Sequence, residues 1–177
     1  GLSLPFPAER QWDGTADPRG RTILVHHEQG LGDSLQFCRY IPLLAARGAR
    51  VVVQAPYPLV RLFSGLEGVA RVVDREGAVP LYDWHCPMMS LPACFGTALG
   101  SIPAQVPYLR PVAGDAVRWS ARLGPHTRPR VGLVWSGGVR PGMPELHATN
   151  ERRNMSFATL ARLNLPGVDF FSLQKGE

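Results

Sequence analysis

The sequence predicts an α/β fold with a parallel sheet and flanking helices. Short, nearly continuous apolar runs recur along the chain, segments with apolar residues at helical spacing separate them, and the connections are short. A continuous apolar run of strand length is typical of a strand buried on both faces. Strands that alternate with helices through short links indicate βαβ units and a doubly wound sheet.

The first elements follow a segment, 1–20, that is rich in Pro, Gly and Asp and has no periodicity. We interpret it as a leader or linker with an anchor at Trp12. Residues 21–27 form an apolar run and predict a strand. From 33 to 47 apolar residues recur at helical spacing, and Gly48 supplies a C-cap, so we expect a helix there.

The next elements continue the alternation. Residues 49–54 form a second apolar run and predict a strand, and 58–63 predict a short helix because a proline stands near its start. Two shorter runs, 69–73 and 81–85, predict the third and fourth strands.

Prolines change the pattern in 86–112, which predicts loops around a helix near 91–99. The stretch 112–123 is expected to be helical because its apolar residues lie four apart on one face. Residues 124–129 have the composition of a linker. They close an N-terminal domain that spans 21–123.

The alternation then restarts in 130–177. Residues 130–135 predict a strand, 156–163 a helix and 168–173 another strand. Two strands and one helix cannot cover their own apolar faces. Either they join the first sheet, or the chain is a fragment of a longer protein and this is the start of its second α/β unit.

Composition and charge exclude several classes of protein. The chain has 177 residues, of which 45% are hydrophobic and 19% charged, so intrinsic disorder is excluded. The net charge of +5 comes almost wholly from scattered arginines, which form no nucleic-acid-binding patch. We expect no membrane span and no secretory leader. Three cysteines without a CxxC pair indicate a reducing compartment. Heavy use of Arg and Ala indicates a GC-rich bacterial genome, so we expect the bacterial cytoplasm.

The turn after the first strand is the first candidate site. It holds Glu28, Gly30, Gly32 and Asp33, and open α/β sheets bind ligands at the carboxyl ends of their strands, beside helix N-termini. Asp33 is either a helix cap or a general base that faces a hydroxyl acceptor. Glu28 either contributes to this crevice or is solvated. Leu35 stands where a dinucleotide fingerprint needs its third glycine.

Histidines near the same edge are further candidates. His26 and His27 are neighbours on a strand, so their side chains point to opposite faces and cannot share a metal ion. We therefore predict no metal site and one histidine in the core. Asp83 and His85 are expected on one face at the end of the fourth strand. They either line the crevice or form a hydrogen bond that fixes the loop.

The turn after the strand 130–135 is the second candidate site. Ser136 and Gly137 begin a small strand-to-helix turn whose backbone amides suit a diphosphate. Arg152 and Arg153 precede a helix. Their planar guanidinium groups either pair with phosphate oxygens or form an exposed basic pair.

Six ordered motifs cover nearly all of the chain, from about Glu9 to its end. They are W-D-G (12–14), H-x-E-Q-G-L-G-D-S-L-Q-F-C-R-Y-I-P-L-L (26–44), D-W-H-C-P-M-M-S-L-P (83–92), I-P-x-x-V-P-Y-L (102–109), V-G-L-V-W-S-G (131–137) and F-x-S-L-Q-K-G (170–176). As a set, these motifs resemble the glycosyltransferase-like region of bacterial tetratricopeptide-repeat proteins. Such regions are similar to heptosyltransferases and O-linked N-acetylglucosamine transferases.

The resemblance implies a GT-B architecture, in which two Rossmann-like domains face a cleft. It implies that the first domain holds the acceptor and that 130–177 is the first β-α-β of the donor domain, truncated here. Asp33 would be the catalytic base of an inverting transfer to a hydroxyl of a sugar, glycan or protein. Ser136, Gly137 and Arg153 would contact the phosphates of a nucleotide-sugar, with no further cofactor. Tetratricopeptide repeats would lie upstream.

Two alternatives remain open. The chain could be a non-catalytic binding or scaffold module that kept this fold. Met155, which stands where relatives often have a basic residue, favours that alternative. A nucleotide-cofactor oxidoreductase or a methyltransferase is weaker, because no acidic residue closes the second strand at Gln54 and Ala55.

Overall fold

The computed structural model describes residues 6–137, 151–152, 154–163 and 165–174. The chain divides into two compact units, one up to Trp119 and the other from Ser120 onward. The boundary falls a few residues before the linker expected at 124–129.

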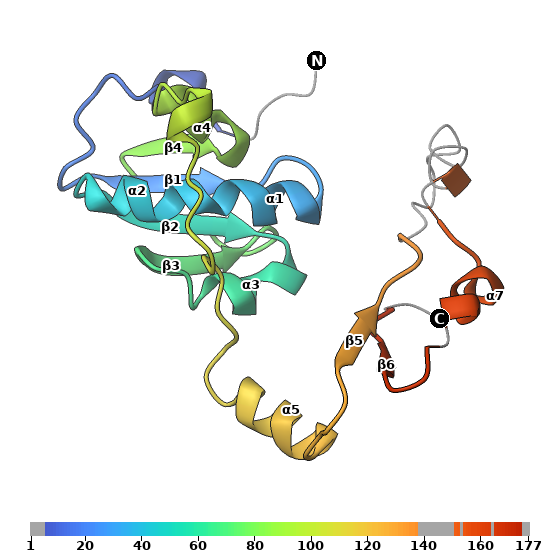
Figure 1. Ribbon diagram of the computed structural model, residues 1–177. Helices are drawn as coiled ribbons and strands as arrows, with labels where there is room; N and C mark the ends of the chain where they lie inside the picture. The colour runs from blue at the N-terminus through green and yellow to red at the C-terminus, as the bar shows by residue number, and fades with distance from the viewer. Residues whose placement is uncertain (1–5, 138–150, 153, 164, 175–177) are drawn as a thin grey trace. The chain divides into compact units, whose positions relative to one another are not determined.

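A four-stranded parallel sheet forms the centre of the first unit (Figure 1). Its strand order is β3-β2-β1-β4, and each neighbouring pair is parallel. The strands are β1 (Thr22–His26), β2 (Arg50–Ala55), β3 (Val69–Asp74) and β4 (Trp84–Pro87). The predicted α/β fold with a parallel sheet and flanking helices is confirmed.

Short helices lie beside the sheet (Figure 1), two between β1 and β2, one between β2 and β3 and one after β4. They are α1 (Leu31–Phe37), α2 (Ile41–Ala46), α3 (Tyr57–Phe63) and α4 (Leu91–Cys94), with 3₁₀ turns at Ala8–Arg10, Cys38–Tyr40, Met88–Ser90 and Leu99–Ser101. The single helix expected over 33–47 is therefore two helices. Pro42 lies in the first turn of α2, where its missing N–H needs no helical partner, so the backbone tightens into a 3₁₀ turn before it.

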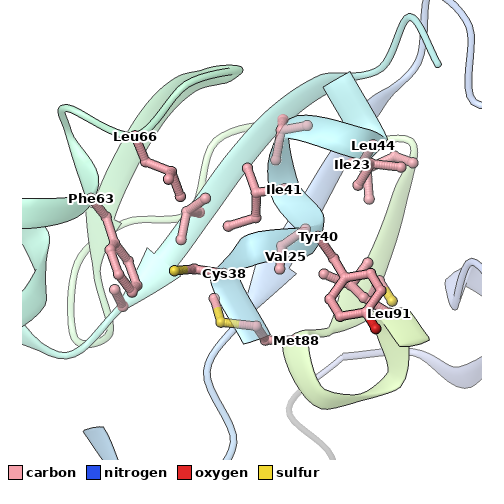
Figure 2. Packing of buried hydrophobic residues seen from close by; sticks show 14 of the residues in the cluster. Ile23, Val25, Cys38, Tyr40, Ile41, Leu44, Phe63, Leu66, Met88 and Leu91 are labelled. Carbon is pink, nitrogen blue, oxygen red and sulfur yellow. The ribbon is translucent and has the colours of Figure 1, made fainter. Parts of the chain in front are cut away.

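The main hydrophobic core lies between one face of the sheet and the helices (Figure 2). Alternate strand residues supply it, because successive side chains on a strand point to opposite faces. Ile23 and Val25 of β1 pack there with Ile41 and Leu44 of α2, and all four are fully buried. Leu24 points to the other face, where it forms a smaller cluster.

The segment before β1 packs on this second face and on the sheet edge. Phe6 packs against the smaller cluster, and Trp12 is buried in the main core. Its backbone N donates to the carbonyl oxygen of His85 (2.8 Å), and its Nε1 donates to the carbonyl oxygen of Ala16 (2.9 Å). The described part of 1–20 therefore belongs to the first unit and is not a free linker.

Two parallel strands, β5 (Arg130–Leu133) and β6 (Asp169–Ser172), form the sheet of the second unit. Helix α7 (Phe157–Leu160) and a 3₁₀ turn (Ala161–Leu163) stand between them in the chain. Helix α5 (Asp115–Leu123) crosses the boundary between the units. The order strand, helix, parallel strand is that of the second α/β unit expected here.

Candidate functional site

Asp33 lies at the carboxyl edge of the first sheet, in the first turn of α1. Gly30 is the N-cap of this helix, and its backbone N donates to Oδ2 of Asp33 over 2.8 Å. The carboxylate is half-buried, and no other hydrogen bond reaches it from the residues that the structure describes. One carboxylate oxygen of Asp33 therefore accepts a hydrogen bond at the start of α1. The other oxygen accepts none from the described residues and can face a ligand.

His27 lies near Asp33, a position that the sequence analysis did not assign to it. It follows the end of β1, and its Nδ1 lies 2.7 Å from Oγ of Ser34, the residue after Asp33. Burial lowers the pKa of the His27 imidazole below its usual value, and the positive charge of Arg75 adds to this effect. The Asp33 carboxylate acts in the opposite direction. A neutral imidazole thus lies beside the carboxylate at neutral pH.

Strand alternation could have found His27. It points away from buried His26, at the edge where ligands bind in open α/β sheets. The position of Arg75 was not predictable in this way. It follows β3, and only the strand order of the folded sheet places the end of β3 at the same edge as the end of β1.

Glu28 is exposed and joins two loops at the same edge. Its Oε2 accepts a hydrogen bond from the backbone N of Met89 over 3.1 Å. Met89 follows β4 and Glu28 follows β1, so this bond ties together the loops that leave neighbouring strands. Glu28 therefore positions the edge of the candidate site.

A groove of about 840 Å³ runs beside α1. Its lining combines apolar side chains with a few polar ones, as ligand sites do. The lining residues are Gly32, Leu35, Gln36, Phe37, Arg39, Tyr40, Pro92, Thr97, Ala98, Leu99, Ile102 and Tyr108. A Cβ on Gly32 would meet no atom within 4 Å. Gly32 lines the groove, and Asp33 is the next residue along α1 but is not itself one of the lining residues.

Arg39 and Tyr108 form one wall of that groove. The guanidinium lies 4.0 Å from the ring centroid of Tyr108, and Nη1 donates to the carbonyl oxygen of Pro103 over 2.9 Å. This stacking places a cation and an aromatic ring side by side. The segment that carries Pro103 and Tyr108 is thereby attached to the chain just after α1.

Asp83 does not lie in this crevice, and the expectation that it lines the crevice is wrong. It precedes β4 and sits at the amino edge of the sheet, where Oδ2 accepts from the backbone N of Thr22 over 2.7 Å. This bond lowers the pKa of Asp83, and Arg21 adds to the effect. The predicted strand 81–85 ends where β4 begins, because the buried residues of this stretch are 85–88.

His85 is also removed from the open crevice. It is fully buried in β4, and its Nδ1 lies 3.1 Å from Nε2 of His26. Its Nε2 lies 2.9 Å from the carbonyl oxygen of Pro7. Because a carbonyl only accepts, Nε2 of His85 carries the proton and Nδ1 accepts from His26. The pair fixes the segment before β1, and the expected bond between Asp83 and His85 is not formed.

At the second candidate site, side chains of the same unit already accept hydrogen bonds from the backbone N–H groups of the turn. The backbone N atoms of Trp135 (3.2 Å) and Ser136 (3.0 Å) donate to Oε1 of Gln174. The backbone N of Gly137 donates to Oδ1 of Asn154 over 2.9 Å. Amide oxygens thus occupy the donors that were expected to hold phosphate. Arg153 lies outside the described residues.

A shallow pocket of about 340 Å³ adjoins this turn and is lined by Val134, Trp135, Ser136, Gly137, Met155 and Leu160. Within the described ranges, no three His, Cys, Asp or Glu side chains come close enough to hold a metal ion. None of the helices in that part of the chain is long and apolar enough to cross a membrane.

Comparison with known proteins gives one informative relative. Protein FlbA of Caulobacter vibrioides is 30% identical over 190 residues, which cover 94% of this chain and 30% of FlbA. The chain thus spans less than a third of the length of that relative. No protein-family model matches the chain. No solved structure matches it.

Proposed function

We propose that the chain is the acceptor-binding part of a glycosyltransferase, with Asp33 as the general base. The observation that supports this most is the position of Asp33. It is a half-buried carboxylate at the carboxyl edge of a parallel sheet, one residue after Gly32, which lines the groove. The acceptor would lie in this groove. Its hydroxyl would face the carboxylate oxygen that Gly30 does not bind.

The chemistry of the transfer follows from that position. Asp33 takes the proton of the acceptor hydroxyl, and the hydroxyl oxygen attacks the anomeric carbon of the sugar from the face opposite the leaving group. The bond from that carbon to the nucleoside diphosphate breaks, and the diphosphate keeps the electron pair. The anomeric configuration is inverted. The product is a glycosylated acceptor and a free nucleoside diphosphate.

The donor side of the proposal involves Ser136, Gly137 and Arg153. For the diphosphate to reach the amides of the turn, the side chains of Gln174 and Asn154 must move away from them. Arg153 would then contribute a planar cation to the departing phosphate oxygens. The setting that we propose is the bacterial cytoplasm, with tetratricopeptide repeats upstream in the intact gene product.

The experiment is a transfer assay on the intact gene product. A panel of nucleotide-sugars is incubated with the protein and a cell extract as the source of acceptors, and release of nucleoside diphosphate is measured. We expect one nucleotide-sugar to give release that depends on the extract. No release from any of them, with the protein folded, would contradict the proposal.

A second candidate is a non-catalytic binding module. The filled turn of the second unit favours it, because Gln174 and Asn154 already satisfy the backbone donors of Trp135, Ser136 and Gly137. For this candidate the same assay gives no release with any donor, while a glycan or peptide still binds. The two candidates therefore differ in turnover and not in binding.

A further inference from the structure

Two free cysteines lie next to each other beside the candidate site, on β4 and α4. The Sγ atoms of Cys86 and Cys94 are 3.8 Å apart. Cys86 is fully buried in β4, whereas Cys94 ends α4 and is partly exposed. A disulfide needs about 2.05 Å between the sulfurs. The two sulfurs therefore have to approach one another further before a bond can form.

The two thiols differ in acidity. A hydrogen bond with Cys86 lowers the pKa of the Cys94 thiol, and the nearby Arg47 acts in the same direction. The same hydrogen bond and burial raise the pKa of Cys86. Because the thiolate is the nucleophile in thiol–disulfide exchange, Cys94 is the thiol that reacts first.

The segment 12–14 holds Cys94 in this position. The thiol of Cys94 lies 3.5 Å from the carbonyl oxygen of Trp12. The backbone of Gly14 runs so close to Cys94 that a Cβ on Gly14 would overlap its carbonyl oxygen. The backbone of Cys94 is thereby fixed, and its thiol is the part that can move toward Cys86.

We propose that Cys86 and Cys94 form a reversible disulfide and that Cys94 is the site at which a small-molecule disulfide attacks this protein. The thiolate of Cys94 attacks one sulfur of oxidised glutathione, a mixed disulfide forms and one glutathione thiolate leaves. The Cys86 thiol then loses its proton and attacks Cys94 Sγ, and the second glutathione leaves. Two protein thiols are oxidised, and one glutathione disulfide is reduced to two thiols.

The disulfide would form close to the carboxyl edge of the sheet. It joins the end of β4 to the end of α4, and the residues between them include Met89, whose backbone N holds Glu28. This inference rests on the distance between the two thiols, their exposure and their acidity, and not on the proposed function. It stands whether or not the chain belongs to a glycosyltransferase.

Cys38 is the internal control. It is fully buried, its Sγ donates to the carbonyl oxygen of Leu35 over 3.2 Å, and burial raises its pKa to about 12. We expect no reaction there in the folded protein. It also falls in a different tryptic peptide, since neither Lys nor Arg stands between Arg75 and Arg110 and trypsin leaves Cys86 and Cys94 in one fragment.

The test is to incubate the folded protein with oxidised glutathione, block the remaining thiols with a maleimide and map the tryptic peptides by mass. We expect the peptide of Cys86 and Cys94 to lose two hydrogens and to carry no maleimide, and reduction to restore both thiols. Cys86→Ser should stop at a stable glutathione adduct on Cys94. Cys94→Ser should remain unmodified, and Cys38→Ser should behave like the wild type.

Three results would overturn the proposal. They are three maleimide-reactive thiols in oxidised wild-type protein, equal modification of Cys38 and Cys94, or modification of Cys94→Ser as fast as of the wild type. If a serine variant fails to fold, the proposal is tested on the folded wild type by the order in which iodoacetamide alkylates its three cysteines. Cys94 must be labelled before both other cysteines.

Discussion

Nε2 of His26 donates a hydrogen bond to Nδ1 of His85 over 3.1 Å, and both imidazoles are buried where the segment before β1 meets the sheet. The pair joins β1 to β4 and, through the bond from His85 to Pro7, holds Phe6 over the rings. Burial keeps His26 neutral in the folded protein at neutral pH, because it lowers the pKa of the imidazole. The stability of the first unit therefore depends on pH.

We expect the free energy of unfolding to fall as the pH falls from about 6.5 to 4. Burial and the neighbouring His85 lower the pKa of His26 from 6.5 to about 4 in the folded protein. Between these values the unfolded chain binds a proton that the folded chain does not, so this contribution to stability is complete above pH 6.5 and lost toward pH 4. The loss is at most ~3 kcal/mol, measured by urea unfolding at several pH values.

The matched variants are His26→Gln and His126→Gln. Glutamine can still donate toward His85 but does not titrate, so His26→Gln should remove most of the slope. His27 contributes a smaller slope of the same sign, because its pKa is also lowered. His126 is exposed, and its replacement should leave the slope unchanged. An unfolding free energy that is equal at pH 7 and pH 4.5 in the wild type would refute this account.

Gly32 is expected to control access to the groove without supporting the fold. Gly32→Ala should stabilise the protein by roughly 0.4–1 kcal/mol, because alanine restricts the unfolded chain and its Cβ meets no atom within 4 Å. Gly32→Leu should be as stable but should fill the groove and raise the KM for acceptor by about tenfold or more, since one or two methylenes already change binding to this extent. Thermal unfolding and acceptor titration measure the two effects. A normal KM in Gly32→Leu would place the acceptor elsewhere.

Gly14 is expected to be far less tolerant than Gly20. Both have a positive φ, +91° and +70°, so alanine costs about 1–2 kcal/mol at either position. At Gly14 the added Cβ also overlaps the backbone of Cys94, whereas at Gly20 nothing lies within 4 Å. Gly14→Ala should therefore lose clearly more stability than Gly20→Ala in urea unfolding, by a further ~1–3 kcal/mol. Equal losses would show that the contact between segment 12–14 and Cys94 is not tight.

Strands with long apolar runs were predictable from the sequence. Thr22–His26, Arg50–Ala55 and Val69–Asp74 lie within a residue or two of the expected strands, because each is a run of β-branched or apolar residues. The fourth strand was displaced by three residues. Leu81 makes its predicted start look apolar, yet this side chain is 98% exposed and the buried run begins later.

For the candidate site, the sequence predicted only the residues that lie in a single turn. Asp33, Gly30 and Gly32 share one turn, and their placement follows from the strand and helix on either side. The pairing of His26 with His85 depends on the register of β1 against β4, which joins residues 59 positions apart. No local pattern encodes that register. Asp83 was placed at the wrong edge for another reason: the fourth strand was expected at 81–85, whereas β4 begins at Trp84, after Asp83.

The most direct test of the proposed function is Asp33→Asn in the intact gene product. The amide oxygen of asparagine can still accept from the backbone N of Gly30, so the start of α1 is kept, but the side chain cannot take a proton. The account predicts that turnover falls by about 10²-fold or more while acceptor binding and unfolding free energy stay near wild type. Asp17→Asn, at another carboxylate that accepts a backbone hydrogen bond, should retain full turnover. Unchanged turnover in Asp33→Asn would contradict the account and leave Asp33 as a helix cap.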